Sequence, residues 1–536
     1  MTLPMIRRLS LSLAALCLGG AAGCVDLTEH PVSEITSAYY STPAGFEAAV
    51  NAMYTPMRSF WPLERGATMT VFGTDEYDKG ADGSYKFFND YNTLLNGDVD
   101  FIRDTWFDFY KGINTANTVI AAAPTTNLPD ATKTTRLGEA KFLRALYYFT
   151  LVRTFGDIPL YTEPTPGVTN ETNREPVAKV YDLIIKDLLE AEAALPDKAA
   201  QFGRADKPAV QHLLGEVYLT RGNAGDAALA VTKLSAVANN SRFSLLKSYK
   251  DIWRIDNEVN SEVVFSIQFT ADPLTTGNGN KLHLYWGFPY DQEPGMKRDI
   301  PGDRPFKRFR PTKWLLALWN RSIDSRYEDM HRFAWLSNNE ATIPKANGVP
   351  KFTLGDTAVF YPSLPTIPAA MRAATRYKLY GEDEYTDAVF PVLNKYLDPT
   401  RTSVNQEEGQ RDHPIFRLAN TYLMLAEALM KDGKPDQGLV WLNKVRTRAA
   451  KPGQEAAMQA TLADMNIDFI LDERSRELTG ETTRWFDLKR TGKLIERVQK
   501  YNPGGKANIK PEHLLRPIPN VEILNSTGNM KQNPGY

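Results

Sequence analysis

Apolar residues recur at helical spacing along much of the chain. The first clear stripe is formed by Trp106, Tyr110, Ile113, Asn117 and Ile120. Steps of three and four place such residues on one face of an α-helix. The same spacing predicts further helices over 139–155, 180–195, 209–221, 224–238, 417–430, 436–448 and 464–479, and one that begins at Arg484. Helices of similar length joined by short turns predict tetratricopeptide-like pairs that bury each other's faces.

The middle of the chain departs from this pattern. Residues 262–268 predict a short strand, and from 271 to 411 the sequence is rich in Gly, Pro and aromatic residues without sustained periodicity. Long irregular segments inside a folded chain are usually functional. The sequence therefore predicts a mainly α fold of tetratricopeptide-like helical repeats, with a large irregular, loop-rich excursion that carries short strands.

The N-terminus has the pattern of an export signal. Two arginines precede an apolar stretch over 9–18, and small residues lead up to Cys24. The apolar stretch is shorter than the about 20 residues that span a bilayer. A cysteine in this place resembles a bacterial lipobox, whose thiol carries a diacylglycerol; the alternative is a plain signal followed by a chance cysteine. We expect 1–23 to be a lipoprotein signal peptide, Cys24 the lipidation site and 24–42 a tether.

Composition narrows the classes of function. Hydrophobic residues make up 42% and charged residues 24% of the 536 residues, which is typical of a folded globular chain. The net charge of -1 argues against a surface for nucleic acid. Of the two cysteines, Cys17 leaves with the signal and Cys24 is expected to be acylated. The mature body would then have no thiol for disulfides, catalysis or metal binding.

Short motifs follow one another in a fixed order along the chain. They are Cys24-Val-Asp-Leu, Gly138-Glu-Ala-Lys-Phe-Leu-Arg-Ala-Leu-Tyr-Tyr-Phe149, Phe155-Gly-Asp-Ile-Pro-Leu160, Phe416-Arg-Leu-Ala419, Asp472-Glu-Arg-Ser-Arg-Glu-Leu478, Arg484-Trp-Phe-Asp-Leu-Lys-Arg490 and Gln532-Asn-Pro-Gly-Tyr536. In order and spacing these motifs resemble the SusD/RagB family, the surface glycan- or nutrient-binding lipoproteins of Bacteroidota. The resemblance covers nearly the whole mature chain.

The resemblance implies a helical fold of four tetratricopeptide-like pairs with an irregular ligand-facing region. It also implies an outer-membrane lipoprotein that faces outward and acts as a lid on a SusC-like TonB-dependent transporter. The implied function is capture of an oligosaccharide or a peptide, without chemistry and without a cofactor. By this resemblance, residues 43–240 form the N-terminal helical region, and residues 241–536 form the C-terminal region, which includes the ligand-facing excursion 271–411.

Two aromatic clusters in loop-like sequence supply the candidate ligand contacts. The candidates are Trp286, Tyr290, Tyr285, Phe288, Tyr77, Tyr85 and Asp75. An exposed aromatic ring beside amides or carboxylates matches the apolar face and the hydroxyls of a sugar. Trp286 and Tyr290 are favoured because the flanking Gly287 and Pro289 indicate exposure. Packing beneath a long loop is the alternative for each cluster.

Other chemistry-bearing residues have a structural interpretation. Trp106 and Tyr110 lie on an apolar stripe and are expected in the core. The run that begins at Asp78 resembles a calcium loop but lacks the ligands at positions three and twelve, so no metal site is expected. Charged residues expected to form scaffold ion pairs are Arg474, Arg476, Glu477, Glu481, Arg484, Asp487 and Arg490, together with Glu139, Arg144 and Glu427, which are expected to pair between helices.

Two alternatives to a capture protein stay open. One is an exported hydrolase with a pair of carboxylates on the excursion. The sequence has no His-Glu-x-x-His, no Gly-x-Ser-x-Gly and no phosphate-binding loop to support it. The other is a peptide-binding scaffold, since tetratricopeptide-like grooves often bind peptides. Product formation would favour the hydrolase, whereas binding without turnover would favour capture.

Overall fold

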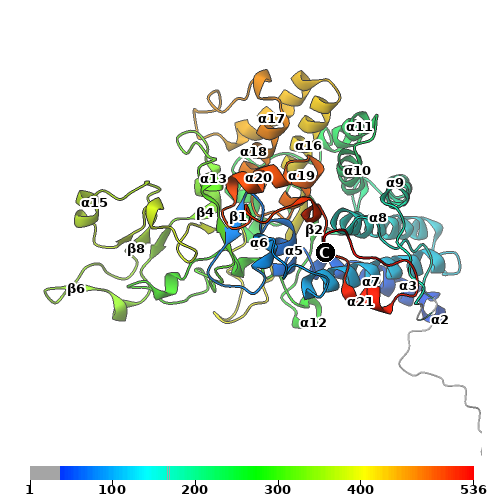
Figure 1. Ribbon diagram of the computed structural model, residues 1–536, viewed down its shortest axis with the longest axis horizontal. Helices are drawn as coiled ribbons and strands as arrows, with labels where there is room; N and C mark the ends of the chain where they lie inside the picture. Colours follow the sequence, from blue (N-terminus) through cyan, green and yellow to red (C-terminus); the bar gives the residue numbers. More distant parts are fainter. Residues whose placement is uncertain (1–36, 166, 168–169) are drawn as a thin grey trace, which may run out of the picture.

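The computed structural model describes residues 37–165, 167 and 170–536 (Figure 1). The predicted signal peptide, Cys24 and most of the predicted tether lie outside the described residues. The end of that tether is helical instead, since α2 spans Ser37–Tyr40. Tyr40 of this helix packs against the main hydrophobic core.

The long helices pack side by side in sequence order. Helices α7 (Asp100–Ala122) and α8 (Asp130–Phe155) are in contact, as are α8 and α9 (Val177–Ala194). Next come α10 (Lys207–Arg221) with α11 (Asp226–Ala238), and α16 (Leu418–Lys431) with α17 (Pro435–Ala449). Helix α16 also packs on α11, so that a C-terminal pair continues the N-terminal stack. The predicted mainly α, tetratricopeptide-like fold is confirmed.

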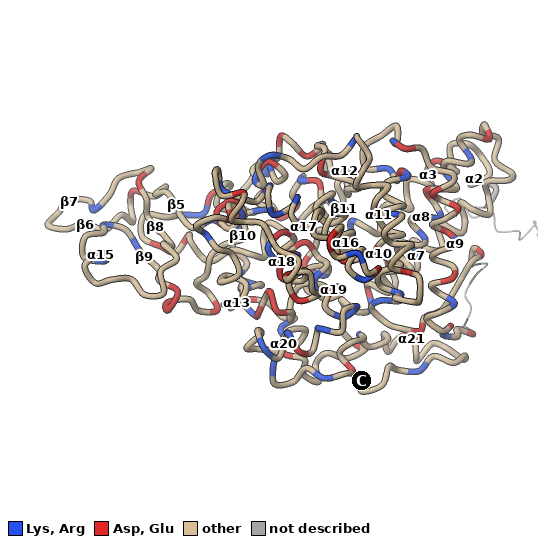
Figure 2. The backbone as a smooth tube through the Cα atoms, turned by 90° about the horizontal axis from the view of Figure 1, so that it is seen from above, with Lys and Arg blue, Asp and Glu red and all other residues tan. Residues whose placement is uncertain are grey.

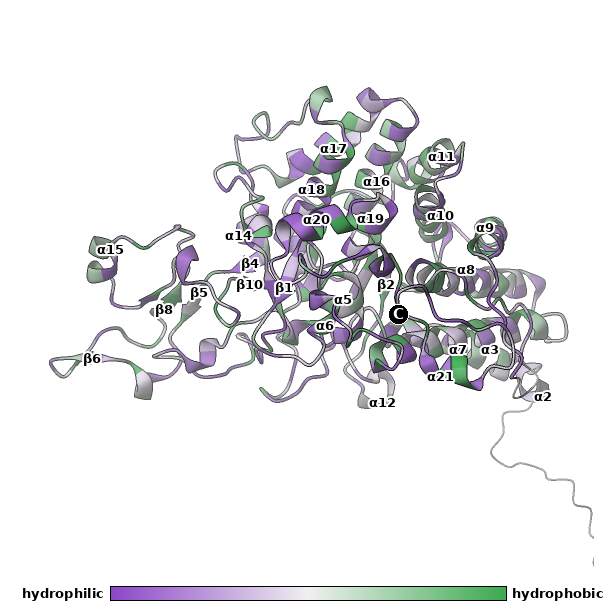
Figure 3. Cartoon of the chain, viewed as in Figure 1, coloured by the Kyte–Doolittle hydropathy of each residue, from purple (hydrophilic) through white to green (hydrophobic). Residues whose placement is uncertain are grey.

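Local sequence explains where these helices begin and end. Asp206 caps α10 by accepting a 3.2 Å hydrogen bond from the Ala209 N–H, and Gly222 ends that helix in the left-handed region. Helix α8 ends at Gly156 as predicted, but it begins nine residues before the predicted start at 139. Its first turns lack an apolar stripe, so periodicity does not detect them. Figure 3 shows hydrophobic and hydrophilic residues alternating along the stacked helices, as expected for amphipathic packing.

Shorter helices lie around the stack and within the excursion. They are α3 (Pro43–Ala52), α4 (Thr55–Arg58), α5 (Glu64–Thr70), α6 (Phe87–Asp90), α12 (Pro273–Thr276), α13 (Lys313–Leu316), α14 (Arg326–Met330), α15 (Ala369–Ala374), α18 (Ile467–Leu478), α19 (Arg484–Arg490), α20 (Leu494–Tyr501) and α21 (Asn520–Asn525). Within the described part of the chain, no helix combines the length and the apolar composition needed to cross a bilayer.

The strands are short and form small sheets. They are β1 (Tyr77–Lys79), β2 (Val263–Ile267), β3 (Phe309–Pro311), β4 (His331–Arg332), β5 (Ala334–Leu336), β6 (Lys345–Ala346), β7 (Val349–Pro350), β8 (Thr357–Phe360), β9 (Lys378–Leu379), β10 (Val392–Leu393) and β11 (His413–Arg417). The antiparallel pairs are β1 with β3, β2 with β11, β4 with β10, β5 with β8 and β6 with β7, while β9 runs parallel to β8. Strand β2 confirms the predicted strand, and its partner β11 leads directly into α16.

Part of the excursion forms a lobe with a hydrophobic core of its own. We call residues 288–296 and 333–392 the projecting lobe. Its core holds Phe288, Tyr290, Trp335 and Tyr361, separate from the large core of the helical body. Strands β5 to β9 and helix α15 extend from one end of the molecule in both Figure 1 and Figure 2. The predicted irregular excursion is therefore folded, and its strands hold the lobe together.

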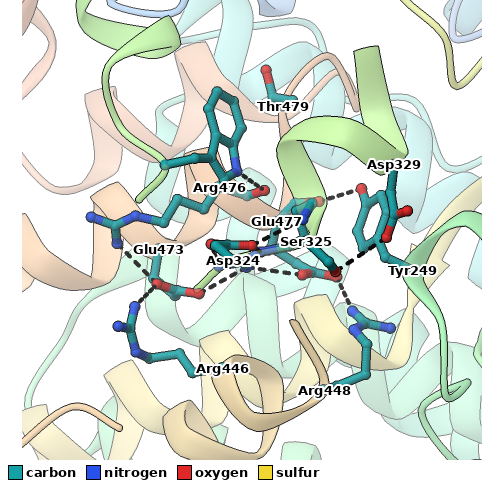
Figure 4. A network of polar contacts seen from close by, with 12 residues as sticks. Tyr249, Asp324, Ser325, Asp329, Arg446, Arg448, Glu473, Arg476, Glu477 and Thr479 are labelled. Atoms are coloured by element: carbon teal, nitrogen blue, oxygen red, sulfur yellow. Dashed lines mark hydrogen bonds and ion pairs between the residues drawn. The ribbon is translucent and has the colours of Figure 1, made fainter. Parts of the chain in front are cut away.

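A buried network of charges joins the excursion to the C-terminal helices (Figure 4). Glu473 on α18 pairs with Arg446 on α17 at 2.5 Å and with Arg476 at 2.9 Å. Arg326 on α14 reaches the same carboxylate at 2.8 Å. Burial alone would raise the pKa of Glu473, but the three arginines lower it far below its ordinary value. Buried charges that are paired in this way fix the geometry of the elements that carry them.

The predicted scaffold ion pairs are confirmed, except that the partners of Glu139 do not lie on another helix. Arg144 on α8 donates to Asp187 on α9 at 2.7 and 2.8 Å, and Glu427 on α16 pairs with Arg490 on α19 at 2.5 Å. Glu139 pairs with Arg136 of its own helix and with Arg204 of the loop before α10. The other confirmed pairs are Arg474–Asp487, Arg484–Asp75, Arg417–Glu477 and Arg417–Glu481.

Candidate functional site

Trp286, the first candidate ligand contact, is only 1% exposed, so its predicted exposure is wrong. Its ring packs against Tyr77 and Phe309, with ring centres 4.8 and 4.9 Å apart. A Cβ at the neighbouring Gly287 would lie 3.1 Å from the Cβ of Pro305. Glycine here therefore permits a close approach of two chain segments, where the sequence suggested an open loop.

The other candidates beside Trp286 are buried as well. Phe288 and Tyr290 pack around Trp335 in the projecting lobe, and the Tyr290 hydroxyl donates to the Asp303 carbonyl at 2.9 Å. Tyr285 is buried at the edge of the main core. The alternative of packing beneath a long loop therefore holds for the cluster 285–290. A long excursion buries its aromatic rings by folding back on the helical body and on itself.

Asp75 and Tyr77 are also buried. Asp75 pairs with Arg484 at 2.6 Å and with Arg497 at 2.7 Å. Burial would raise the pKa of Asp75, but the two guanidinium groups lower it below its ordinary value. The Tyr77 hydroxyl lies 3.2 Å from that of Thr479. Both residues tie strand β1 and its preceding turn to the C-terminal helices, which leaves neither open to a ligand.

Tyr85 is only partly buried and lines an open groove. The groove has a volume of about 660 Å³ and lies between α5, the side of α7 and the start of the excursion. We call it the α7 groove. Its lining residues are Ser59, Leu63, Glu64, Arg65, Tyr85, Phe101, Asp104, Phe107, Asp108, Asn278, Lys281 and Tyr285. Two candidates from the sequence, the partly buried Tyr85 and the almost fully buried Tyr285, thus both line this groove.

Aromatic rings form one side of the α7 groove. Tyr85 stacks on Phe101 with ring centres 3.7 Å apart, and its hydroxyl donates to Asp100 at 2.8 Å. Burial, together with this hydrogen bond to a carboxylate, raises the pKa of Tyr85 above its ordinary value. Phe107, which like Phe101 belongs to α7, has a 41% exposed side chain. The stack is therefore held in place, while Phe107 offers a free face.

Charged groups lie beside these rings. Arg65 pairs with Asp108, and Asp104 pairs with Arg103 at 2.8 Å, both near the outer face of α7. Glu64 lies 3.2 Å from Arg308. Burial raises the pKa of Glu64, and the nearby Arg308 opposes that rise. Aromatic faces beside fixed carboxylates and guanidinium groups match the alternating apolar and hydroxyl surfaces of a saccharide.

The residues on α7 were missed by the sequence analysis. Phe101, Asp104 and Asp108 follow one another at steps of three and four, so they share a face. That face lies opposite the buried stripe of Trp106 and Ile113, which the periodicity did find. Aromatic residues on the polar face of an amphipathic helix are the signal that could have found the groove.

In the segment that resembles a calcium loop, the carboxylates pair with basic side chains of the protein itself. Asp78 pairs with Arg310 and accepts a 2.8 Å hydrogen bond from Asn89, and Asp82 pairs with Lys307 at 2.8 Å. Over the described residues, no cluster of three or more His, Cys, Asp or Glu side chains could hold a metal ion.

Known proteins share this architecture. The architecture is a stack of tetratricopeptide-like helix pairs that carries a loop-rich lobe and a side groove. Residues 377–536 match the model of the SusD family, and residues 30–219 match a model described as starch-binding associating with outer membrane. The chain belongs to the SusD/RagB family, as its motifs predicted.

Individual relatives cover nearly the whole chain. SusD-like protein P2 of Formosa agariphila is 26% identical over 537 residues, which is 96% of this chain and 97% of the relative. Starch-binding protein SusD of Bacteroides thetaiotaomicron is 26% identical over 442 residues, covering 77% and 75%. A solved structure described as a laminarin binding SusD-like protein matches with a TM-score of 0.69 and 25% identity, covering 93% of this chain and all of that one.

Proposed function

We propose that this protein is a lipid-anchored binding protein of the outer membrane that captures an oligosaccharide in the α7 groove. The supporting observation is the groove itself, where the exposed ring of Phe107 and the Tyr85–Phe101 stack lie beside paired charges. Relatives described as starch-binding and laminarin-binding support a glycan as the ligand. An oligosaccharide is therefore favoured over a peptide.

The groove can bind a sugar without large rearrangement. Tyr85 is held by Phe101 and Asp100, and Arg65 is held by Asp108 and by the Ser59 carbonyl at 3.1 Å. Side chains that are already fixed lose little conformational entropy when a ligand arrives. The sugar ring would stack on Phe107, and its hydroxyls would bond to the carboxylates of Asp104 and Asp108.

Anchoring and delivery complete the proposal. The thiol of Cys24 would carry the lipid, and the segment that follows it would tether the body to the outer face of the membrane. The partner would be a SusC-like TonB-dependent transporter on which the protein acts as a lid. Tethering beside a pore raises the effective concentration of bound ligand, so a modest affinity is sufficient.

Binding without turnover is the proposed mode of action. A glycosidase needs one carboxylic acid and one carboxylate at a set separation across the scissile bond. In the α7 groove, Asp104, Asp108 and Glu64 each have an arginine partner. These carboxylates are therefore engaged in ion pairs, and the product analysis described below tests whether any of them acts on a glycan.

A glycan and peptide array tests this function. The mature protein with Cys24→Ser, which cannot be acylated, is applied to both ligand classes, and the supernatant is analysed for products. We expect retention on a subset of oligosaccharides with no cleavage. Retention on peptides alone, or release of shortened glycans, would contradict the proposal.

A further inference from the structure

A second cavity opens where α8, α9 and α19 meet the C-terminal segment. Its volume is about 780 Å³, and it shares no lining residue with the α7 groove. Small-molecule sites commonly measure roughly 300–1,000 Å³. Tyr181, Phe486 and Leu515 give this cavity apolar walls. It therefore has room and apolar surface for the body of a small organic molecule.

The charged lining of this cavity is mainly positive. It contains Arg153, Arg174, Arg221, Lys489 and Arg490. Three of these have carboxylate partners that do not line the cavity: Arg153 pairs with Glu216, Arg221 with Asp226 and Arg490 with Glu427. The acidic lining residues, Asp157 and Asp182, have exposed side chains.

Lys489 and Arg174 lack such partners. The ammonium group of Lys489 donates to the backbone carbonyl of Arg153, and within the described residues it has no ion pair with a carboxylate. Arg174 donates to the carbonyls of Asp157 and Lys531 at 2.7 Å and to the Asn533 side chain at 2.6 Å. Those acceptors are neutral, so neither cation has a carboxylate within ion-pair distance among the described residues, although the charge of Asp157 opposes the effect of burial on the pKa of Arg174.

Burial makes these charges costly. It lowers the pKa of Lys489 to about 7, with Arg153 and Arg516 acting in the same direction, and it lowers the pKa of Arg174. Arg516 itself is fully buried, and among the described residues it forms no ion pair. A half-buried cation without a counter-ion is destabilising. A ligand carboxylate would favour the protonated lysine and supply the missing negative charge.

We propose that this cavity binds a small organic anion, with its carboxylate or sulfate group on Lys489 and Arg174 and its body against Phe486 and Tyr181. Helix α9 begins beside the cavity with Val177 and Ala178, but the Val177 N–H already donates to the Asp157 carboxylate at 2.9 Å, which leaves recognition of the anion to Lys489 and Arg174. The site goes beyond the proposed glycan groove and does not depend on it. An acidic saccharide and an acid with a hydrocarbon body are two sources of this chemistry.

Matched probes distinguish charge recognition from apolar binding. We would titrate the mature Cys24→Ser protein below pH 7 with 4-phenylbutyrate and methyl glucuronide, each beside its neutral partner, 4-phenylbutyramide and methyl glucoside. We expect one acid to bind saturably, and its neutral partner to bind at least about tenfold more weakly. The acid that binds identifies the source. Equal binding of acid and neutral partner, or no saturation by either acid at about 10 mM, would overturn the proposal.

Two variants test whether the acid binds in this cavity. Lys489→Gln removes one cation, and Ala178→Phe narrows the cavity at an exposed position while both cations stay in place. Both should weaken acid binding by about tenfold. Lys493→Gln is the matched control, because Lys493 pairs with Asp468 and Glu496 away from the cavity.

The second variant keeps the test decisive. If Lys489→Gln does not fold, Ala178→Phe with an unchanged melting temperature decides alone. Wild-type affinity in Ala178→Phe would contradict the site. Phe107→Ala, in the α7 groove, should leave acid binding unchanged, so that failure of one proposal can be told from failure of the other.

Discussion

The guanidinium group of Arg326 lies 2.8 Å from the carboxylate of Glu473, and both side chains are fully buried. Arg326 belongs to α14 in the excursion, whereas Glu473 belongs to α18 near the C-terminus. Arg326 also pairs with Asp324 at 2.7 Å and with Glu477 at 3.1 Å. One side chain thus joins the loop-rich half of the molecule to the helical body.

Replacing Arg326 should therefore destabilise the whole fold. Arg326→Met leaves three buried carboxylates short of a partner, and removal of one member of a buried pair costs about 3–5 kcal/mol. Urea unfolding followed by tryptophan fluorescence measures the loss. Arg321→Met is the control, since its pair with Glu328 is half-exposed and should cost at most about 1 kcal/mol. Equal losses in the two variants would contradict a central role for Arg326.

The pair between Glu427 and Arg490 predicts a defined pH dependence. Burial would raise the pKa of Glu427, but Arg490 and Lys431 lower it to about 2. The unfolded value is about 4.3, so this group stabilises the fold above that pH, and the contribution disappears as the pH falls towards 2.

Comparison with Glu427→Gln isolates this effect. The difference in unfolding free energy between wild type and variant should shrink by about 3 kcal/mol between pH 7 and pH 2. A difference that stays constant over that range would show that the pair does not perturb Glu427.

The burial of Trp286 gives a third prediction. Trp286→Ala leaves a cavity between Tyr77, Phe309 and Tyr396, and large-to-small substitutions of this kind cost about 3–5 kcal/mol. Thermal unfolding should show a large fall in melting temperature. An unchanged melting temperature together with weaker ligand binding would return Trp286 to the ligand-facing role that its sequence context suggested.

Removal of the exposed ring of Phe107 tests whether the α7 groove binds the ligand. Phe107→Ala should weaken oligosaccharide binding by about 0.5–1.5 kcal/mol, or roughly two- to tenfold in Kd, because a stacking face is lost. Leu189→Ala on α9 is the matched control, since Leu189 is 43% exposed and lies outside the groove. Titration calorimetry with the glycan chosen from the array gives both affinities. The same Kd for Phe107→Ala and wild type would exclude stacking on this ring.

The helices could be predicted from the sequence because their apolar stripes are local patterns. Helix α8 shows this, since its stripe through Leu143, Leu146 and Leu151 and its end at Gly156 need no tertiary information. The family motifs were also local, and the buried ion pairs followed from the rule that charges at helix junctions are paired.

The ligand-facing surface could not be predicted in the same way. Gly287 and Pro289 indicated an open loop, but the burial of Trp286 depends on Phe309 and Tyr396, which are distant in sequence. Phe107 lies on the polar face of α7, and only the placement of α5 and Lys281 beside that face makes it part of a groove. Long-range packing decides both cases, and it leaves no periodic signal in a single sequence.

A structure of the protein with its oligosaccharide bound tests the proposed site most directly. We expect a sugar ring stacked on Phe107 in the α7 groove, with hydroxyls within hydrogen-bond distance of Asp104 or Asp108. A glycan bound elsewhere, for example on the projecting lobe, with an empty α7 groove would contradict it.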